Sequence, residues 1–249
     1  MDNSLSAVSV INHKYVVAER NGFEHRKVVE SSVERMIILA SQSPRRRELL
    51  TQMGVEFEIM VSKKDEIVTE TEPEKIVTEL SMAKGEEILC QLKDSKRIPN
   101  ELLPIKEGES FGDECEEGIL VISADTLVFL GEKRLGKPKD EEDAFNMLKS
   151  LSGNVHRVLT GVTLNYVVGN RCKTVSFASS TEVTMALMDD YEINEYVASG
   201  EPMDKAGAYA IQGKCAKYVT GICGEYANVV GLPIAHLYSE IKKIGYKLG

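Results

Sequence analysis

The order of strand-like and helix-like segments predicts an α/β protein with a mixed central sheet flanked by helices. β-Rich runs alternate with amphipathic helical segments along most of the 249 residues, which favours parallel strand pairing. Two β-rich runs, 155–168 and 171–187, are joined by Gly169-Asn170, a sequence typical of an antiparallel hairpin. Because both kinds of pairing are indicated, we expect a mixed sheet rather than a purely parallel one.

The composition is that of a globular chain and argues against two classes of partner. Hydrophobic residues make up 43% and charged residues 28%, close to the averages for soluble proteins. Lys plus Arg 30 against Asp plus Glu 39 gives a net charge of −9, which argues against a nucleic-acid polymer or an anionic membrane surface as partner. The apolar runs are also too short to span a bilayer. An anionic ligand would therefore need a local cluster of basic residues.

The cysteines and the N-terminal residues bear on the cellular compartment. The chain has 5 cysteines, an odd number with no C-x-x-C pair, which signals neither a zinc knuckle nor a disulfide framework. Residues 1–35 lack the apolar core of a secretory signal, and their acidic residues argue against an organelle transit peptide. The sequence therefore predicts a reducing, cytoplasmic location.

The first predicted element after residue 35 is a buried strand, 36–40, that turns sharply into a helix. Ser43 is a natural N-cap, Pro44 suits the first helical position, and Gly54 is placed to end the helix. The turn therefore presents a helix N-terminus directly after a strand.

A second helix opens at Pro73 and carries an apolar stripe from Ile76 to Leu89, with Lys84 beside it. From 91 to 118, charges, prolines and glycines replace this periodicity, which indicates a long loop or insertion. The remaining expected elements are a strand at 119–130, a polar turn at 131–138, a helix at 140–151, the hairpin, a helix at 189–199, a Gly-rich β-like stretch at 206–230 and a helix at 233–246.

Arginines crowd the start of the first helix, where the macrodipole favours acids. Arg45 and Arg46 lie in its first turn, beside the hydroxyls of Ser41 and Ser43. Backbone N–H groups, hydroxyls and guanidinium groups at a helix N-terminus together make a phosphate cradle. A solvated basic turn is the alternative interpretation. The phosphate site is favoured because the turn supplies geometry as well as charge.

A carboxylate lies inside the most apolar strand. Asp125 falls within 119–130, where its desolvation is unfavourable unless the carboxylate is paired or bound to a metal. It is the best single candidate for a working acid or base, and an aspartate that caps a turn or pairs with a core cation is the alternative. Lys137 lies on a tight Gly-Lys-Pro loop placed to return to the same end of the sheet, although the pattern is not a P-loop.

A stretch of small residues, 204–213, would let a ligand approach the backbone closely. Gln212 in this stretch could bind a base edge through its amide, or could simply be solvated. His156 is one of 4 histidines, none at metal-ligand spacing, and we interpret it as a hydrogen-bonded strand histidine. No G-x-S-x-G elbow supports serine-hydrolase chemistry.

Five motifs in a fixed order carry a family resemblance. They are SQSPRRRELL, SADTLVFLGEKRLGKP, LSGNVHRVLTGV, DKAGAYAIQG and YANVVGLP. With them the chain resembles the Maf-type nucleoside triphosphate pyrophosphatases, in the branch that prefers dTTP and UTP. The resemblance implies an elongated mixed sheet with two lobes around a cleft, similar in architecture to the inosine triphosphate pyrophosphatases. It also implies cleavage between the α- and β-phosphates to a monophosphate and pyrophosphate, with a divalent cation, Mg²⁺ or Mn²⁺.

The resemblance assigns roles to individual residues. Asp125 matches the proton acceptor, and Asp125 and Glu66 match acidic positions at the metal. The positions that match groups facing the triphosphate are Ser41, Arg46, Lys84 and Lys137. The positions that match the base-selecting set of the dTTP- and UTP-preferring branch are Arg45, Thr126 and Gln212. Because strand side chains alternate, Thr126 should point to the face opposite Asp125 unless the strand bulges.

The chain departs from the family pattern in two places. Residues 1–35 precede the usual start, so we expect an N-terminal extension followed by a Maf-like domain, 36–249, with an insertion near 91–118. The expected partner is a nucleoside triphosphate, and a homodimer is left open. Two alternative functions also stay open: a less selective metal-dependent phosphatase, and a nucleotide-binding regulator of cell division and septum formation.

Overall fold

The computed structural model describes residues 35–63, 67–106, 109, 111 and 118–248, together with the backbone of a hairpin nearer the N-terminus. That hairpin pairs β1 (Val8–Ile11) with β2 (Lys14–Val17) in antiparallel register. The other described strands are β3 (Met36–Leu39), β4 (Glu58–Ile59), β5 (Leu103–Pro104), β6 (Ile119–Leu130), β7 (Lys133–Leu135), β8 (Val155–Val168), β9 (Arg171–Met185) and β10 (Val219–Cys223).

These strands form one mixed sheet, as the sequence predicts. Its order is β10-β9-β8-β6-β3-β4, with β7 paired to β6 and β5 paired to β9. β3 runs parallel to β6 and β4, whereas β6, β8 and β9 are antiparallel neighbours. The predicted hairpin turn between β8 and β9 is confirmed, and Gly169 adopts a positive φ of 55° there.

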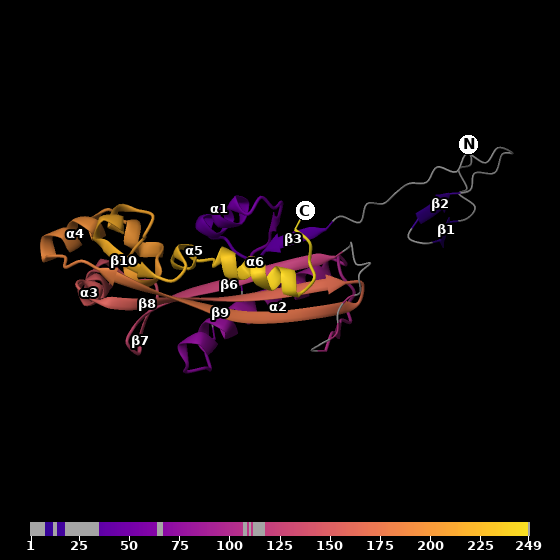
Figure 1. Ribbon diagram of the computed structural model, residues 1–249, viewed down its shortest axis with the longest axis horizontal. Coiled ribbons are helices and arrows are strands. Elements are labelled where there is room, and N and C mark those ends of the chain that lie inside the picture. Colours follow the sequence, from indigo (N-terminus) through magenta and orange to yellow (C-terminus); the bar gives the residue numbers. More distant parts are fainter. Residues whose placement is uncertain are drawn as a thin grey trace.

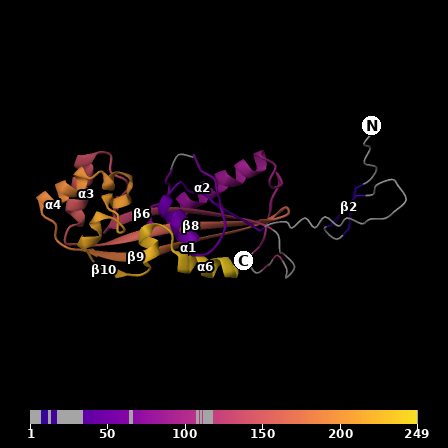
Figure 2. The same cartoon turned by 90° about the horizontal axis from the view of Figure 1, so that it is seen from above.

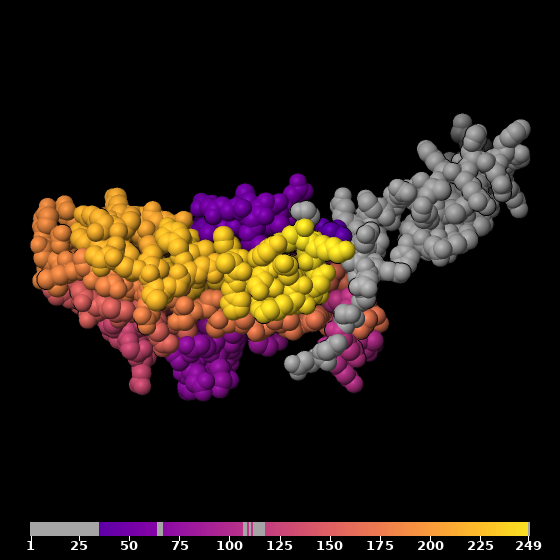
Figure 3. All heavy atoms as spheres, viewed as in Figure 1, coloured from indigo at the N-terminus to yellow at the C-terminus, as the bar shows by residue number. Residues whose placement is uncertain are grey.

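Helices cover both faces of this elongated sheet (Figure 1). α2 (Pro73–Asp94) packs on β6, β8 and β9 from one side. α1 (Pro44–Gln52), α5 (Tyr226–Val230) and α6 (Ile234–Lys243) lie on the other side. Figure 3 shows the C-terminal segment running lengthwise along the sheet.

A second group of helices gathers at one end of the sheet (Figure 2). It contains α3 (Glu141–Leu151) and α4 (Asp190–Ala198), which pack together beside the 3₁₀ turns η1 (Glu201–Asp204) and η2 (Ala206–Ala208). Both α-helices confirm predicted ones, and their N-caps are Asp140 and Asp189. The molecule therefore has two helical regions on one continuous sheet.

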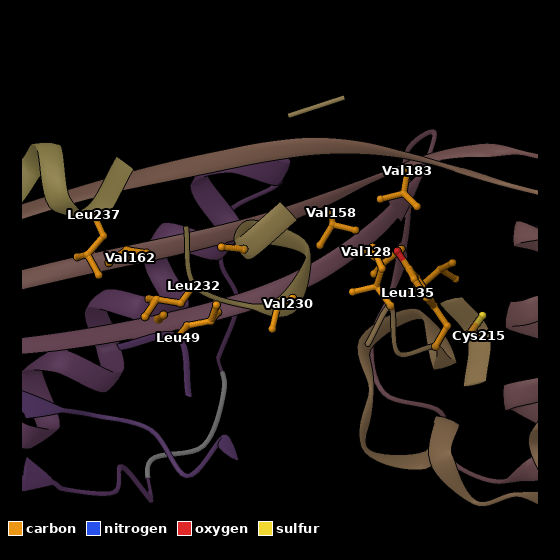
Figure 4. Close-up of a cluster of buried hydrophobic side chains, with 14 of the residues drawn as sticks. Leu49, Val128, Leu135, Val158, Val162, Val183, Cys215, Val230, Leu232 and Leu237 are labelled. Atoms are coloured by element: carbon orange, nitrogen blue, oxygen red, sulfur yellow. The ribbon is translucent and has the colours of Figure 1, made fainter. Parts of the chain in front are cut away.

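The central strand β6 is buried on both faces, which explains its nearly unbroken apolar sequence. Ile122 belongs to the hydrophobic cluster that contains Leu49 of α1 and Leu237 of α6, and Figure 4 shows these two leucines pointing at the sheet. On the opposite face, Phe129 packs in a cluster with Leu80 of α2. Side chains of β6 thus alternate between the two helical layers.

Several predicted boundaries were wrong because tertiary packing extends or replaces the local pattern. α2 continues to Asp94, into the predicted loop, because its last turns bury Leu92 against the sheet. β7 lies within the predicted polar turn, where Leu135 is buried. Within 91–118, β5 also adds a short strand to β9.

The stretch 206–230 is not β-like along its length, which corrects the sequence prediction. It contains η2, η3 (Lys214–Tyr218), the short strand β10 and then α5. Gly207, with a φ of 70°, introduces a kink within η2. Small residues therefore serve tight turns here rather than a strand. Within the described residues, no helix combines the length and apolar character needed to cross a bilayer.

Candidate functional site

The site begins at a gap along one edge of β6. β3 pairs with this edge only as far as Leu39 opposite Ile122, and β7 pairs with it from Leu135 opposite Val128. Between them, no described strand pairs with this edge of β6 at residues 123–127. The backbone of β6 is therefore open to the side in the middle of the sheet.

A cleft of about 660 Å³ lies at this gap. It is lined by segments that follow β3 and β7, by α1, α2 and β6, and by residues from 204–212 and 229–231. The predicted site residues found in its lining are Ser41, Arg45, Arg46, Lys84, Asp125, Thr126, Lys137 and Gln212. The ninth, Glu66, lies outside the described residues. The structure thus brings eight predicted residues from five segments into one cleft.

Asp125 and Thr126 reach the cleft from opposite faces of the strand. Their register with β8 is uninterrupted, Asp125 opposite Gly161 and Thr126 opposite Thr160, so no bulge rotates either side chain. Asp125 faces α2, whereas Thr126 faces α1 and α5. Only a gap in the sheet edge lets both faces contribute to one site.

Asp125 forms an ion pair with Lys84 of α2. The Lys84 Nζ donates to Asp125 Oδ1 at 2.5 Å, and the two side chains are 19% and 9% exposed. A carboxylate this buried needs such a partner to offset its lost hydration. The cation-paired alternative is therefore observed, and the pair lines the cleft.

Two glycines let α2 approach the sheet closely enough for this pair. A Cβ atom at Gly161 would lie 2.1 Å from the carbonyl oxygen of Val77 in α2, and one at Gly85 would lie 2.7 Å from Asn165 Nδ2. Hydroxyl groups add to this attachment: Ser123 Oγ donates to the Ser81 carbonyl at 2.7 Å. α2 is thereby fixed against β6 and β8 at the level of Lys84.

The arginine-rich helix start is built into the cleft. Arg46 donates from Nε to the Gly231 carbonyl at 2.8 Å, from Nη1 to Ser41 Oγ at 3.2 Å and from Nη2 to Thr126 Oγ1 at 3.0 Å. Arg45 is half-buried, with its Nη1 3.8 Å from Asp204 Oδ2. A solvated basic turn does not describe these two arginines.

Asp204 and Lys205 also line the cleft, and they were not among the predicted site residues. They form an ion pair with each other. Burial alone would raise the pKa of Asp204, but the hydrogen bond and charge of Lys205, helped by Arg45, lower it overall. Their position at the head of the DKAGAYAIQG motif was the signal that could have identified them.

His156 connects β8 with the segment that carries Gln212. Its Nε2 lies 2.8 Å from the hydroxyl of Tyr209, which itself lines the cleft. The ring is buried, and burial lowers the pKa of His156 to about 4. His156 is therefore a strand histidine hydrogen-bonded through Nε2, as predicted, whereas its buried Nδ1 has no hydrogen-bond partner among the described residues.

The oxygen ligands in the cleft fit a hard divalent cation that takes its remaining ligands from a bound phosphate. Among the described residues, no group of three or more His, Cys, Asp or Glu side chains could hold a metal alone. Asp125 and Asp204 are the carboxylates in the described lining. Mg²⁺ commonly takes one or two carboxylates and completes its shell with water and phosphate oxygens, so Asp125 suits such an ion.

Comparison with known proteins assigns the family. Residues 36–244 match the model of the Maf family, which is described as "Maf-like protein". The chain belongs to the Maf family. This confirms the resemblance that the five motifs carry.

Individual Maf relatives cover most of the chain. One from Agathobacter rectalis is 46% identical over 84% of this chain and 97% of its own length. Others from Lachnoclostridium phytofermentans and Carboxydothermus hydrogenoformans are 43% identical, over 85% and 84% of this chain and 96% and 99% of their own lengths. All three relatives bear the name dTTP/UTP pyrophosphatase.

Proposed function

We propose that this chain hydrolyses nucleoside triphosphates, with dTTP and UTP preferred, between the α- and β-phosphates to give the monophosphate and pyrophosphate. The observation that carries the proposal is one buried carboxylate, Asp125, in a cleft lined by several cations. Those cations are Arg45, Arg46, Lys84, Lys137 and Lys205. The names of the Maf relatives support the choice of substrate.

Asp125 is the proposed proton acceptor. It orients the attacking water at the α-phosphorus or takes the proton of that water. A positioned carboxylate can act in either way. Lys84 holds the Oδ1 oxygen at 2.5 Å and so fixes the direction of the carboxylate. The water oxygen forms the new bond to phosphorus as the bond to the bridging oxygen of pyrophosphate breaks.

The cations are proposed to stabilise the leaving pyrophosphate. Charge develops on the bridging oxygen as the bond breaks, and preorganised donors that meet this charge lower the barrier. Arg46 is already oriented by three hydrogen bonds, and guanidinium groups bind phosphate with paired, charge-assisted donors. Lys137 is an exposed residue of the cleft lining, after β7.

Asp125, with Glu66 as the second carboxylate, is proposed to hold a Mg²⁺ or Mn²⁺ ion. When bound, such an ion would neutralise charge on the phosphate oxygens and increase the acidity of water. Cleft residues would still provide the orientation of the nucleotide.

Arg45, Thr126 and Gln212 are proposed to select the base. The arginine and the glutamine amide can donate to pyrimidine carbonyl oxygens, and the glutamine oxygen can accept from N3–H of thymine or uracil. Cytosine lacks that hydrogen, so it would leave the acceptor unpaired. Gln212 is exposed without a nucleotide, and a bound base would cover its amide. An ill-matched base is then rejected because the covered polar group has no partner.

The experiment is incubation of the protein with dTTP, UTP, CTP, ATP and GTP in the presence of Mg²⁺, resolving every phosphorus-containing product. The proposal predicts monophosphate and pyrophosphate, with the highest kcat/KM for dTTP and UTP. Release of orthophosphate would instead identify a phosphatase. Tight nucleotide binding without turnover would support a regulatory protein.

A further inference from the structure

A line of hydrogen-bonding side chains connects Arg46 with the buried interior of β8. Thr126 Oγ1 lies 3.0 Å from Arg46 Nη2 and 2.9 Å from Thr160 Oγ1. Thr160 Oγ1 in turn lies 3.1 Å from the carbonyl oxygen of Asn228 in α5. Thr160 has no exposed surface and is absent from the cleft lining, so it cannot touch a nucleotide directly.

The number of hydroxyl hydrogens decides which group donates and which accepts in each of these hydrogen bonds. A hydroxyl has a single hydrogen to donate. The Asn228 carbonyl can only accept, so Thr160 donates to it and has no hydrogen left for Thr126. Thr126 therefore donates to Thr160 and presents a lone pair to Arg46, which can only donate. The alternative acceptor for Thr126, the Gly231 carbonyl, is more distant at 3.4 Å.

The far end of the line is anchored in the core. Asn228 has no exposed surface, and its Nδ2 donates to the Val158 carbonyl and to Thr181 Oγ1, both at 2.9 Å. Thr181 Oγ1 then donates to the Glu225 carbonyl at 3.1 Å. These bonds hold α5 on the sheet and keep the Asn228 carbonyl above Thr160.

We infer that Thr160 is a positioning residue for Arg46: by taking the hydrogen of Thr126, it makes that hydroxyl an acceptor that aims the guanidinium into the triphosphate cleft. This inference rests on the proposed function of the cleft. Without Thr160, the Thr126 hydroxyl loses its acceptor and can rotate its hydrogen to the Gly231 carbonyl, which turns its lone pairs away from Arg46. This weakens one of the three contacts that the described residues make to the guanidinium.

The kinetic test is a double-mutant cycle with Thr160→Val and Arg46→Ala. Thr160→Val keeps the side-chain shape and should lower kcat/KM for dTTP by about tenfold, the equivalent of one lost hydrogen bond to a charged group. In the Arg46→Ala background it should cause no further loss. Thr160→Ser, which keeps the hydroxyl, should restore activity. Equal losses in both backgrounds, or no loss in either, would overturn the inference.

The control is Thr174→Val. Thr174 is an exposed residue of β9 that also makes a side-chain hydrogen bond, a part-buried one of 2.8 Å to Asn165 Oδ1, but it lies outside the cleft lining and the line to Arg46. The Thr174→Val protein should be less stable than the unaltered protein but should have the same kcat/KM. If Thr160→Val does not fold, Thr160→Ala removes the same hydroxyl, and its effect on kcat/KM should likewise vanish in the Arg46→Ala background.

A spectroscopic measurement separates this inference from the proposed function. The Nε–H of Arg46, hydrogen-bonded to Gly231, should give a nitrogen-15 resonance that disappears in Arg46→Ala. Thr160→Val should shift or broaden that resonance in the nucleotide-free protein, and Thr160→Ser and Thr174→Val should not. An unchanged resonance in Thr160→Val would contradict the inference even if dTTP is hydrolysed. A changed one would support it even if dTTP is not.

Discussion

At the scale of single residues, Asp125 has the most constrained surroundings. Its side chain is 9% exposed, paired with Lys84 and part of the cleft lining. We expect Asp125→Asn to lower kcat for dTTP by roughly a thousandfold or more while nucleotide binding survives, because the change removes the proton acceptor and little volume. Turnover and binding are measured separately, by product formation and by titration calorimetry.

The matched control for this prediction is Asp140→Asn. Asp140 caps α3 away from the cleft, and asparagine is an equally good cap, so activity and stability should both persist. Near-normal kcat in Asp125→Asn at saturating Mg²⁺ would remove the proton-acceptor assignment.

Lys137 tests the role of the cations without disturbing the fold. Its side chain is exposed, so Lys137→Ala should leave thermal stability unchanged while kcat/KM falls about a hundredfold or more through lost transition-state stabilisation. Lys133→Ala, at an exposed position of β7 outside the cleft lining, should change neither property. Equal activity of the two variants would contradict the proposed role.

Arg46→Ala, by contrast, should also lower stability, because it removes contacts to Gly231, Ser41 and Thr126.

Gln212 tests base selection. Replacing its amide by a carboxylate removes a donor to the base carbonyl, so Gln212→Glu should reduce the preference for UTP over CTP more than it reduces maximal turnover. The measurement is the ratio of kcat/KM for the two nucleotides in both proteins. Comparable kcat/KM for UTP and CTP in the unaltered protein would refute the assignment of Gln212 as a base reader.

Residue patterns predicted the members of the cleft better than their mutual contacts. Arg45 and Arg46 were predicted from the misfit between arginines and a helix N-terminus, and Asp125 from a carboxylate in an apolar run. The partners of Arg46 were not predictable, because Thr126 and Gly231 are distant in sequence and meet it only through packing.

At the scale of elements, the approach of α2 to the sheet decides whether Lys84 can reach Asp125. We expect Gly161→Ala to destabilise the fold by about 1–3 kcal/mol, because the new methyl would overlap the α2 backbone at Val77. Activity should fall as well, since α2 would have to move. Chemical unfolding and kcat/KM are the measurements.

Gly221→Ala is the corresponding control. Its methyl would meet Thr184 at an ordinary contact distance of 3.5 Å, in β10 and away from the cleft. It should have little effect on stability or activity. Wild-type stability and activity in Gly161→Ala would show that close packing of α2 is not required.

Local sequence predicted most elements but misassigned those whose form depends on distant contacts. Caps and breakers identified α1, α3 and α4 because these signals act within one turn of the helix. The turns of 206–218 could not be predicted in the same way. A Cβ atom added at Gly207 would lie 2.9 Å from Val128 of β6, so a glycine is required by a contact that only the assembled sheet supplies.

At the scale of the whole molecule, the gap between β3 and β7 unites the two faces of the sheet in one site. Asp125 contributes from the α2 face, and Thr126 and Arg46 contribute from the α1 and α5 face. Motif order predicted that these residues belong together, but not that an interrupted sheet edge joins them. That geometry follows from strand registers set by long-range pairing.

Stability of the whole fold should depend on pH through His156. Burial lowers its pKa to about 4 in the folded state, against about 6.5 in the unfolded chain. Between these values the unfolded state binds a proton that the folded state does not, so the free energy of unfolding falls as the pH drops. His156 does not reduce the free energy of unfolding above a pH of about 6.5. By pH 4, it reduces the free energy of unfolding by up to about 3 kcal/mol.

The measurement is urea unfolding of the protein and of His156→Gln across this pH range. The variant should lose less stability on acidification than the unaltered protein. Parallel pH dependences in the two proteins would contradict the depressed pKa of His156.

The most direct test of the proposed chemistry is hydrolysis of dTTP in oxygen-18 water, followed by phosphorus NMR of the products. Attack at the α-phosphorus with pyrophosphate leaving predicts dTMP carrying one oxygen-18 atom and unlabelled pyrophosphate. Formation of dTDP and orthophosphate, or recovery of the label in pyrophosphate, would contradict this account of the cleft.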